Sequence, residues 1–261
     1  MKVPLLAILM WALVLTAPLV LRNHGRLSHS RLIKGQPQQS ANATPPDTDR
    51  IVSAFTAKET EFRDALVQYS FKRDAVVQTI GPGGQISGEY HRISQLAFDT
   101  GGKRIEKILL FPTPTLRAIG ISSEDLDDLG GVQLFALEAS KAPLYNFKYV
   151  GIERIDELDL HVFDVSPKAL PDPKKAKERF FRGRIWVDTE ANQIVKTRGK
   201  GVPEPKSGGF PNVEIFREEI ERGLWFPTYA YADEELILGT GEVVHLRMKV
   251  SFTEFKKVTR K

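Results

Sequence analysis

The stretch RFFRGRIWVDTEANQIVKTRGKG, residues 179–201, shows how this chain is built. An apolar and basic run reaches the turn-forming residues 188–192, and a second run continues through Ile194, Val195 and Thr197. Two such runs joined by a short polar turn predict an antiparallel hairpin. Side chains alternate along a strand, so Trp186 must face the opposite way from its two neighbours. The hairpin contains no residue set typical of catalysis, and it therefore indicates architecture rather than chemistry.

The same rhythm recurs along most of the chain. Turn-forming residues separate the other strand-like runs and lie at 81–84, 101–102, 156–157, 222–223 and 239–241. This spacing predicts about nine to eleven strands in sequence-local hairpins. No alternation of strands with helices is visible, which disfavours a parallel sheet. We therefore predict a mainly β (α+β) fold.

Helical periodicity is confined to short parts of the sequence. Residues 47–49, Asp-Thr-Asp, precede apolar residues at helix-like spacings: Ile51, Phe55, Phe62, Leu66 and Tyr69. This pattern predicts one amphipathic helix with an acidic start that suits the helix dipole. Residues 122–126, Ser-Ser-Glu-Asp-Leu, predict a second, short helix with a serine cap. In all, we expect two or three helices.

The N-terminus carries an export signal. Residues 3–21 are uncharged and long enough to cross a bilayer, and Lys2 is the only charged side chain before them. We therefore predict a signal peptide or membrane anchor at 1–22, a disordered linker at 23–48 and the folded domain at 49–261. The basic residues after the apolar run oppose a simple anchor with a cytoplasmic N-terminus. The predicted location is the periplasm, with the leader either cleaved or kept as a tether to the inner membrane.

Composition excludes several classes of function. The 261 residues include no cysteine, which rules out disulfides, thiolate metal sites and cysteine nucleophiles. The net charge of +4 is compatible with contact to a membrane surface, but no nucleic-acid-binding module accompanies it. We therefore predict no nucleic-acid partner. No feature of the sequence sets the oligomeric state.

Catalytic and metal-binding patterns are missing from the sequence. The histidines of the predicted domain, His91, His161 and His245, lie far apart, and none belongs to a metal-binding or catalytic motif. We predict no catalytic residue, no metal site, no cofactor and no enzymatic activity. The alternative of an enzyme requires these histidines to converge with carboxylates in the folded chain.

Aromatic residues provide the positive signal for binding. Tyr145, Phe147 and Tyr149 stand two apart, so they share one face of a strand, and Tyr229 and Tyr231 do the same. Apolar rings with polar tips suit the wall of a cavity for an apolar ligand. We predict these five residues as ligand-binding. The alternative is that they form an ordinary core between a sheet and a helix.

Taken together, the apolar leader, the first helix and the long meander resemble the LolA/LolB-like outer-membrane lipoprotein-sorting family. The resemblance is carried by IVSAFTAKETEFRDAL (51–66), by FFRGRIWVDTEANQIVKTRGKG (180–201), and by GLWFPTY (223–229) with the closing HLRMKVSFTEFKK (245–257). It covers most of residues 49–257. These are patterns of a fold rather than catalytic signatures.

The resemblance implies an incomplete antiparallel β-barrel plugged by two or three helices. It implies that an apolar half-barrel cavity binds lipid or the acyl chains of lipoproteins, with a lid around residues 122–131. The alternative on the same fold is an envelope sensor or protein-interaction domain without lipid transport. Two departures stand out: no basic residue aligns with the cavity arginine expected of a lipoprotein carrier, and the absence of cysteine excludes the lipid-anchored receptor form.

Overall fold

A computed structural model describes residues 46–117, 119–121, 137–170, 179–203 and 211–258. The residues from Pro46 onward form one compact unit. The predicted leader and most of the linker, the short helix expected at 122–126 and the lid expected around 122–131 lie outside the described residues. None of the helices in the described part is both long enough and apolar enough to cross a membrane.

Ten strands form one antiparallel sheet, which confirms the predicted strand number. The elements are α1 (Thr48–Leu66), β1 (Tyr69–Ile80), β2 (Ile86–Phe98), β3 (Arg104–Leu110), the 3₁₀ helix η1 (Ala142–Leu144), β4 (Tyr145–Ile155), β5 (Leu158–Pro167), β6 (Phe180–Asp188), β7 (Ile194–Val202), β8 (Val213–Glu221), β9 (Leu224–Ile237) and β10 (Val243–Lys257).

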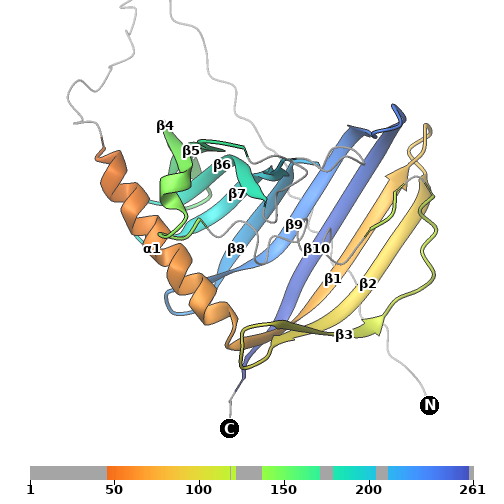
Figure 1. Cartoon of the computed structure of the whole chain (residues 1–261), viewed down its shortest axis with the longest axis horizontal. Coiled ribbons are helices and arrows are strands. Elements are labelled where there is room, and N and C mark those ends of the chain that lie inside the picture. Colours follow the sequence, from red (N-terminus) through yellow and green to blue (C-terminus); the bar gives the residue numbers. More distant parts are fainter. Residues whose placement is uncertain (1–45, 118, 122–136, 171–178, 204–210, 259–261) are drawn as a thin grey trace, which may run out of the picture. The chain divides into compact units, whose positions relative to one another are not determined.

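The strand order leaves the sheet open. Strands β4 to β10 follow one another as a meander, and β1 then pairs with β10, so that the order is β3-β2-β1-β10-β9-β8-β7-β6-β5-β4. The edges are therefore β3 and β4, which do not pair with each other. Figure 1 shows the sheet curving between these edges, with α1 lying across one face. An incomplete antiparallel barrel has this topology.

The number of helices differs from the prediction. The described residues contain one α-helix and one short 3₁₀ helix, rather than two or three plugging helices. Elsewhere in the described part the apolar residues alternate with a period of two, which builds strands. Tyr69, predicted at the end of the first helix, is instead the first residue of β1.

Helix α1 forms where capping and periodicity agree. The side chain of Asp47 caps the helix by accepting a hydrogen bond from the backbone N–H of Arg50 at 3.1 Å, and Asp49 lies in the first turn. The buried residues of the helix begin with an adjacent pair, then recur three or four positions apart, and form one stripe: Phe55, Thr56, Glu59, Phe62 and Leu66. This stripe faces the sheet.

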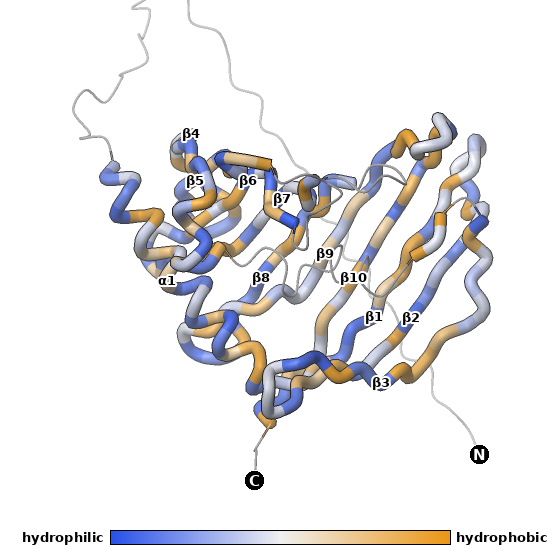
Figure 2. The backbone as a smooth tube through the Cα atoms, viewed as in Figure 1, coloured by the Kyte–Doolittle hydropathy of each residue, from blue (hydrophilic) through white to orange (hydrophobic). Residues whose placement is uncertain are grey.

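The face of the sheet covered by α1 is called the inner face here, and the opposite face is the outer face. Burial alternates along β1 at every residue, and Figure 2 shows hydrophobic and hydrophilic residues alternating along neighbouring strands. Two large apolar clusters lie on the inner face. One joins the C-terminal half of α1 to β1, β2, β9 and β10, and the other joins its N-terminal half to β4, β5 and β6. Burial of these clusters is the main force that holds the helix on the sheet.

The hairpin of residues 179–201 is formed by β6 and β7, as predicted. The carboxylate of Asp188 accepts hydrogen bonds from the backbone N–H groups of Glu190 and Ala191 at 3.0 and 2.5 Å, and Asn192 adopts a left-handed conformation that closes the turn. Trp186 pairs with Lys196 on the outer face, whereas Ile185 and Val187 are buried in an inner-face cluster. The predicted opposite orientation of Trp186 is therefore confirmed.

Candidate binding site on the inner face

Strand β4 presents three aromatic residues on the inner face: Tyr145, Phe147 and Tyr149, called the aromatic wall below. Their partners on β5 are Pro167, Val165 and Phe163. Tyr145 is buried, and its hydroxyl accepts a hydrogen bond from the backbone N–H of Phe181 at 3.0 Å. The other two rings are only partly buried. The structure thus brings these three predicted site residues together on one surface that solvent reaches.

The N-terminal half of α1 lies against this wall. The fully buried ring of Phe55 contacts Phe147 edge-on, with ring centroids 5.6 Å apart, and Phe163 at 5.9 Å. Ile51 and Val52, one turn earlier on the helix, pack partly buried against the same cluster, as does Phe180 of β6. Accessible apolar side chains therefore line both the helix and the strands at this end of the inner face. Such a surface suits a hydrocarbon chain.

Burial favours the uncharged forms of Tyr149 and of His161 beside it. Burial raises the pKa of Tyr149 above its ordinary value. Burial also lowers the pKa of His161, and the negative charge of Asp188 only partly opposes this effect. The Tyr149 hydroxyl and Nδ1 of His161 lie 3.3 Å apart and can share a hydrogen bond. The wall therefore presents no full charge that would have to be desolvated by an apolar ligand.

Hydrogen bonds and ion pairs also hold α1 against the inner face. Arg217 of β8 forms a bidentate ion pair with Glu59, and Thr60 accepts a hydrogen bond from the backbone N–H of Ala139 at 3.1 Å. Arg63 forms an ion pair with Glu138. The helix is thus held by directional bonds in its middle, where the two apolar clusters meet, as well as by burial.

Tyr229 and Tyr231 lie on the opposite side of the sheet. They alternate with Ala230 and Ala232, which belong to the inner-face core, so both tyrosines point to the outer face. Their rings are nearly parallel, with centroids 6.4 Å apart, and Tyr229 is 37% exposed. The two groups of predicted ligand-binding residues, on β4 and on β9, therefore lie on opposite faces of the sheet. The reason is the phase of β9, whose small inner residues leave the large rings outside.

Sequence reasoning missed two buried arginines on the inner face. Arg73 is 1% exposed and shares the inward phase of β1 with Phe71 and Ala75, and Arg217 is 7% exposed and follows Ile215 in the inward phase of β8. A basic residue in the apolar phase of a strand is the signal that would have found both. The apolar interior therefore contains two buried guanidinium groups, those of Arg73 and Arg217.

Arg73 belongs to a cluster of charged side chains from three neighbouring strands, β1, β2 and β3. Glu106 of β3 forms ion pairs with Arg73 at 2.8 Å and with Arg92 of β2 at 3.0 Å, and Ser94 donates a hydrogen bond to it at 2.6 Å. Burial alone would raise the pKa of Glu106. The Ser94 hydrogen bond and the nearby arginines outweigh that effect and hold the pKa below its ordinary value. Glu106 therefore stays ionised as part of a buried polar cluster.

The three histidines do not meet. His161 is on the inner face beside Tyr149, whereas on the outer face His91 lies 2.9 Å from Asp74 and His245 contacts Asp233. No group of histidine and carboxylate side chains suited to a metal occurs in the part of the chain that the structure describes. The convergence that an enzyme based on these histidines would need is not formed by these residues.

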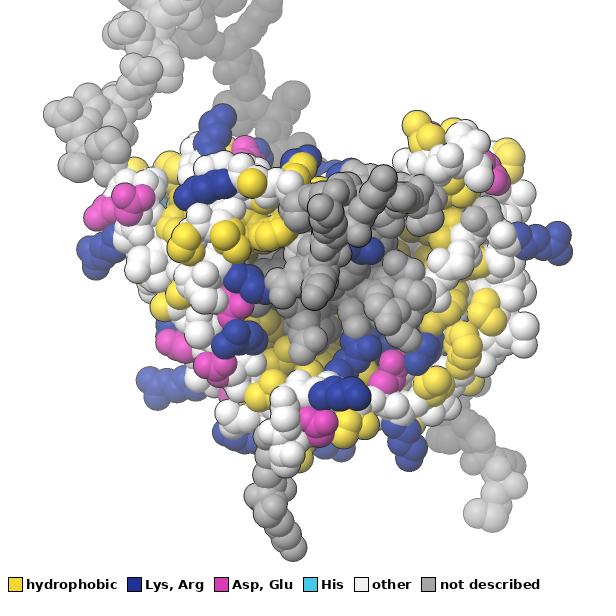
Figure 3. Space-filling view, in the orientation of Figure 1, with side chains coloured by type: hydrophobic (Ala, Val, Ile, Leu, Met, Phe, Trp, Pro, Cys, Tyr) yellow, Lys and Arg dark blue, Asp and Glu magenta, His cyan; other side chains and the backbone are white. Residues whose placement is uncertain are grey.

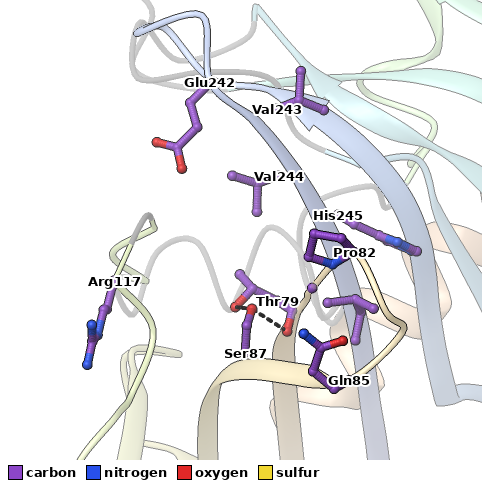
Figure 4. Close-up of a pocket in the computed structure, with 11 residues that line it drawn as sticks. Thr79, Pro82, Gln85, Ser87, Arg117, Glu242, Val243, Val244 and His245 are labelled. Carbon is purple, nitrogen blue, oxygen red and sulfur yellow. Dashed lines mark hydrogen bonds between the residues drawn. The ribbon is translucent and has the colours of Figure 1, made fainter.

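A pocket lies at the tips of the hairpins β1–β2 and β9–β10. It has a volume of about 430 Å³, and Figure 4 shows Arg117 across it from His245. The hydroxyl of Ser87 bonds to the hydroxyl and the carbonyl oxygen of Thr79 at 3.0 and 3.1 Å, so these polar atoms are engaged with each other. None of the five predicted ligand-binding residues lines this pocket.

Comparison with known proteins gives similarities of fold. No family model and no curated protein sequence matches this chain. Among solved structures, a DUF1329 family protein from Desulfovibrio piger is 16% identical, with a TM-score of 0.38 over 79% of this chain and 92% of that one. A putative outer membrane lipoprotein-sorting protein domain from Vibrio parahaemolyticus is 10% identical, with a TM-score of 0.38 over 78% and 92%. A LolA-superfamily protein from Nitrosomonas europaea is 14% identical, with a TM-score of 0.35 over 82% and 94%.

These neighbours include the family that the sequence resembles. Identities of 10–16% and TM-scores below 0.4 support no conclusion about what this chain does. What this chain binds must therefore follow from its own residues.

Proposed function

We propose that this chain is a binding module for lipid or for the acyl chains of lipoproteins. In this proposal, Phe147 and Tyr149 contact the hydrocarbon, with Tyr145 behind them and Ile51 and Val52 of α1 opposite. The observation that carries the proposal is the partial exposure of an uncharged aromatic wall directly under an apolar helix face. Each buried methylene would contribute about 0.8 kcal/mol to binding.

The location follows from the leader. The uncharged residues 3–21 favour export, so we place the domain in the periplasm, either free after cleavage or tethered to the inner membrane. The proposed domain is 49–261, after a linker at 23–48. The solved lipoprotein-sorting domain and LolA-superfamily protein to which the chain is similar agree with an envelope protein, but the proposal rests on the leader and the wall.

A second candidate is an interaction or sensor domain that carries no lipid. It is favoured by the inner face of β1, β2, β9 and β10, where buried side chains such as Tyr90, Met248 and Leu246 fill the core. A core filled by its own side chains leaves less room for a ligand. The two candidates therefore differ over whether the aromatic wall is a ligand surface or a thinly covered part of the core.

The test is native mass spectrometry of the full chain purified from a bacterial envelope, with extraction and identification of bound lipid. Phe147→Asp places a charge in the aromatic wall. Tyr229→Asp is the matched control, because it places the same charge on an exposed aromatic position of the outer face. We expect lipid on the wild type and on Tyr229→Asp but not on Phe147→Asp. Circular dichroism should show that all three proteins are folded. A wild type that carries no lipid and takes up none when it is added would overturn the proposal and leave the interaction domain.

A further inference from the structure

Strand β3 is an apolar edge of the sheet. Four of its side chains, together with that of Phe111 directly after it, are between 44% and 52% exposed: Ile105, Ile108, Leu109, Leu110 and Phe111. Figure 3 shows hydrophobic side chains on the lower right of the molecule, around the position of β3 in Figure 1. An edge strand exposes backbone N–H and C=O groups that can pair with another strand. Here those groups are flanked by apolar side chains that a partner strand would bury.

The other edge is built differently. Strand β4 is interrupted by a bulge at residues 149–151, and charged, exposed side chains lie on both sides of it: Lys148, Glu153 and Arg154. Although Val150 and Ile152 of β4 are also exposed, a bulge and charges are the usual protection against strand addition. Strand β3 has one bulge of its own, near its end at residues 108–110, and its pairing with β2 is uninterrupted from Arg104 to Ile108. The edge that accepts a further strand most readily is therefore β3.

The charged side chains of β3 indicate which residue types a strand paired with this edge would carry. Lys103 and Lys107 are exposed along the edge. The one carboxylate of the strand, Glu106, points to the inner face and forms ion pairs with Arg73 and Arg92. The exposed surface of the edge is thus apolar and basic, and it complements an apolar segment with acidic residues.

The same charges disfavour a second copy of this chain as the occupant. Two β3 strands paired antiparallel about their centres would bring their basic side chains together, and like charges opposite each other destabilise a sheet. We propose that the edge of β3, which pairs with no further strand among the described residues, binds an extended segment of a partner protein in which apolar residues alternate with acidic ones. The segment adds as an eleventh strand, with its backbone paired to β3 and its acidic side chains near Lys107.

The test uses the full chain in mild detergent and a fluorescent nonapeptide of alternating valine and glutamate, with blocked ends. Binding is followed by fluorescence anisotropy, and hydrogen exchange locates the protected amides. Two control peptides are used: one with lysine in place of glutamate, and one with every backbone nitrogen methylated, which has no N–H group left to donate to an edge. We expect the glutamate peptide to bind, both controls to fail, and protection to be concentrated in residues 104–110.

Variants separate this edge from the rest of the surface. Lys107→Glu should weaken peptide binding about fivefold, by removing an attraction and adding a repulsion. Lys148→Glu makes the same change on the exposed side of β4, the other edge, and should leave binding unchanged. Equal binding of the methylated peptide, protection outside β3, or no binding at all would overturn the proposal. Dimers that dissociate in Leu109→Asp, seen by sedimentation without peptide, would identify a second copy as the occupant and would also overturn it.

Discussion

Arg217 of β8 donates two hydrogen bonds to Glu59 of α1, at 2.5 and 3.0 Å, and the side chains of these residues are only 4% and 0% exposed. The guanidinium group of Arg217 also lies 4.8 Å above the ring of Phe62. Glu59 lies on the helix between Phe55, in one apolar cluster, and Phe62, in the other. This ion pair therefore fixes the position of α1 at the point where the two clusters meet.

Removing one partner of this pair should destabilise the protein strongly. Glu59→Leu or Arg217→Met leaves an uncompensated buried charge, which costs about 3–5 kcal/mol in the free energy of unfolding. The double variant should lose less than the sum of the two, because no charge is then left unpaired. Urea denaturation measures all three. As a control, Lys58→Ala removes the exposed pair with Glu61 and should cost no more than about 1 kcal/mol. Additive losses in the double variant would contradict the coupling.

The ring of Phe55 should be one of the most sensitive positions of the helix. Phe55→Ala removes a fully buried ring that contacts Phe147 and Phe163, and the cavity left behind costs about 3–5 kcal/mol. On the outer face, Tyr229→Ala removes a partly exposed ring and should cost much less. Chemical denaturation of the two variants compares them directly. Similar losses would show that the helix does not depend on this contact.

Two glycines face each other across β6 and β7, and neither tolerates a side chain. A methyl group on Gly199 would lie 2.4 Å from the carbonyl oxygen of Arg182 and 2.6 Å from the ring of Phe181. The ring occupies the space that the paired Gly183 and Gly199 leave open. Gly199→Ala should therefore lower the free energy of unfolding by about 1–3 kcal/mol, because the ring or the strand must shift. Gly120→Ala is the control, since its added methyl group would meet no atom of the described residues within 4 Å.

Asp233 should contribute stability that is lost in acid. The hydrogen bond with His245, assisted by bonds from Arg247 and Tyr231, lowers the pKa of Asp233 to about 2. An aspartate in the unfolded chain titrates near 3.9, so the unfolded state takes up a proton first as the pH falls. The stabilisation is complete above about pH 5 and is lost progressively as the pH falls from about 5 to about 1.

Denaturation curves measured from pH 6 to pH 2 check this dependence. Asp233→Asn should be less stable than the wild type at pH 6, and the difference should shrink toward pH 2. Asp156→Asn changes an exposed aspartate in the turn between β4 and β5 and should leave the acid dependence as it is in the wild type. A difference for Asp233→Asn that does not change with pH would contradict the assignment.

Much of the fold could be predicted because its signals are local. The turn residues 81–84, 156–157 and 188–192 separate alternating runs, and both turn chemistry and a period of two act over a few residues. The start of α1 at Thr48 follows equally from the cap at Asp47 and the stripe of apolar residues behind it. Even Arg73 could have been found as a basic residue in the inward phase of a strand.

What the sequence determined by itself was therefore the succession of hairpins, the first helix and the grouping of Tyr145, Phe147 and Tyr149 on one face. Only the tertiary structure decided that this face is the inner one, whereas Tyr229 and Tyr231 point outward. Alternation shows which residues share a face, but the side that is buried depends on which surface α1 covers. The pairing of β1 with β10 and the open edge at β3 were decided in the same way. They depend on contacts between segments more than 100 residues apart in the sequence, which local patterns do not specify.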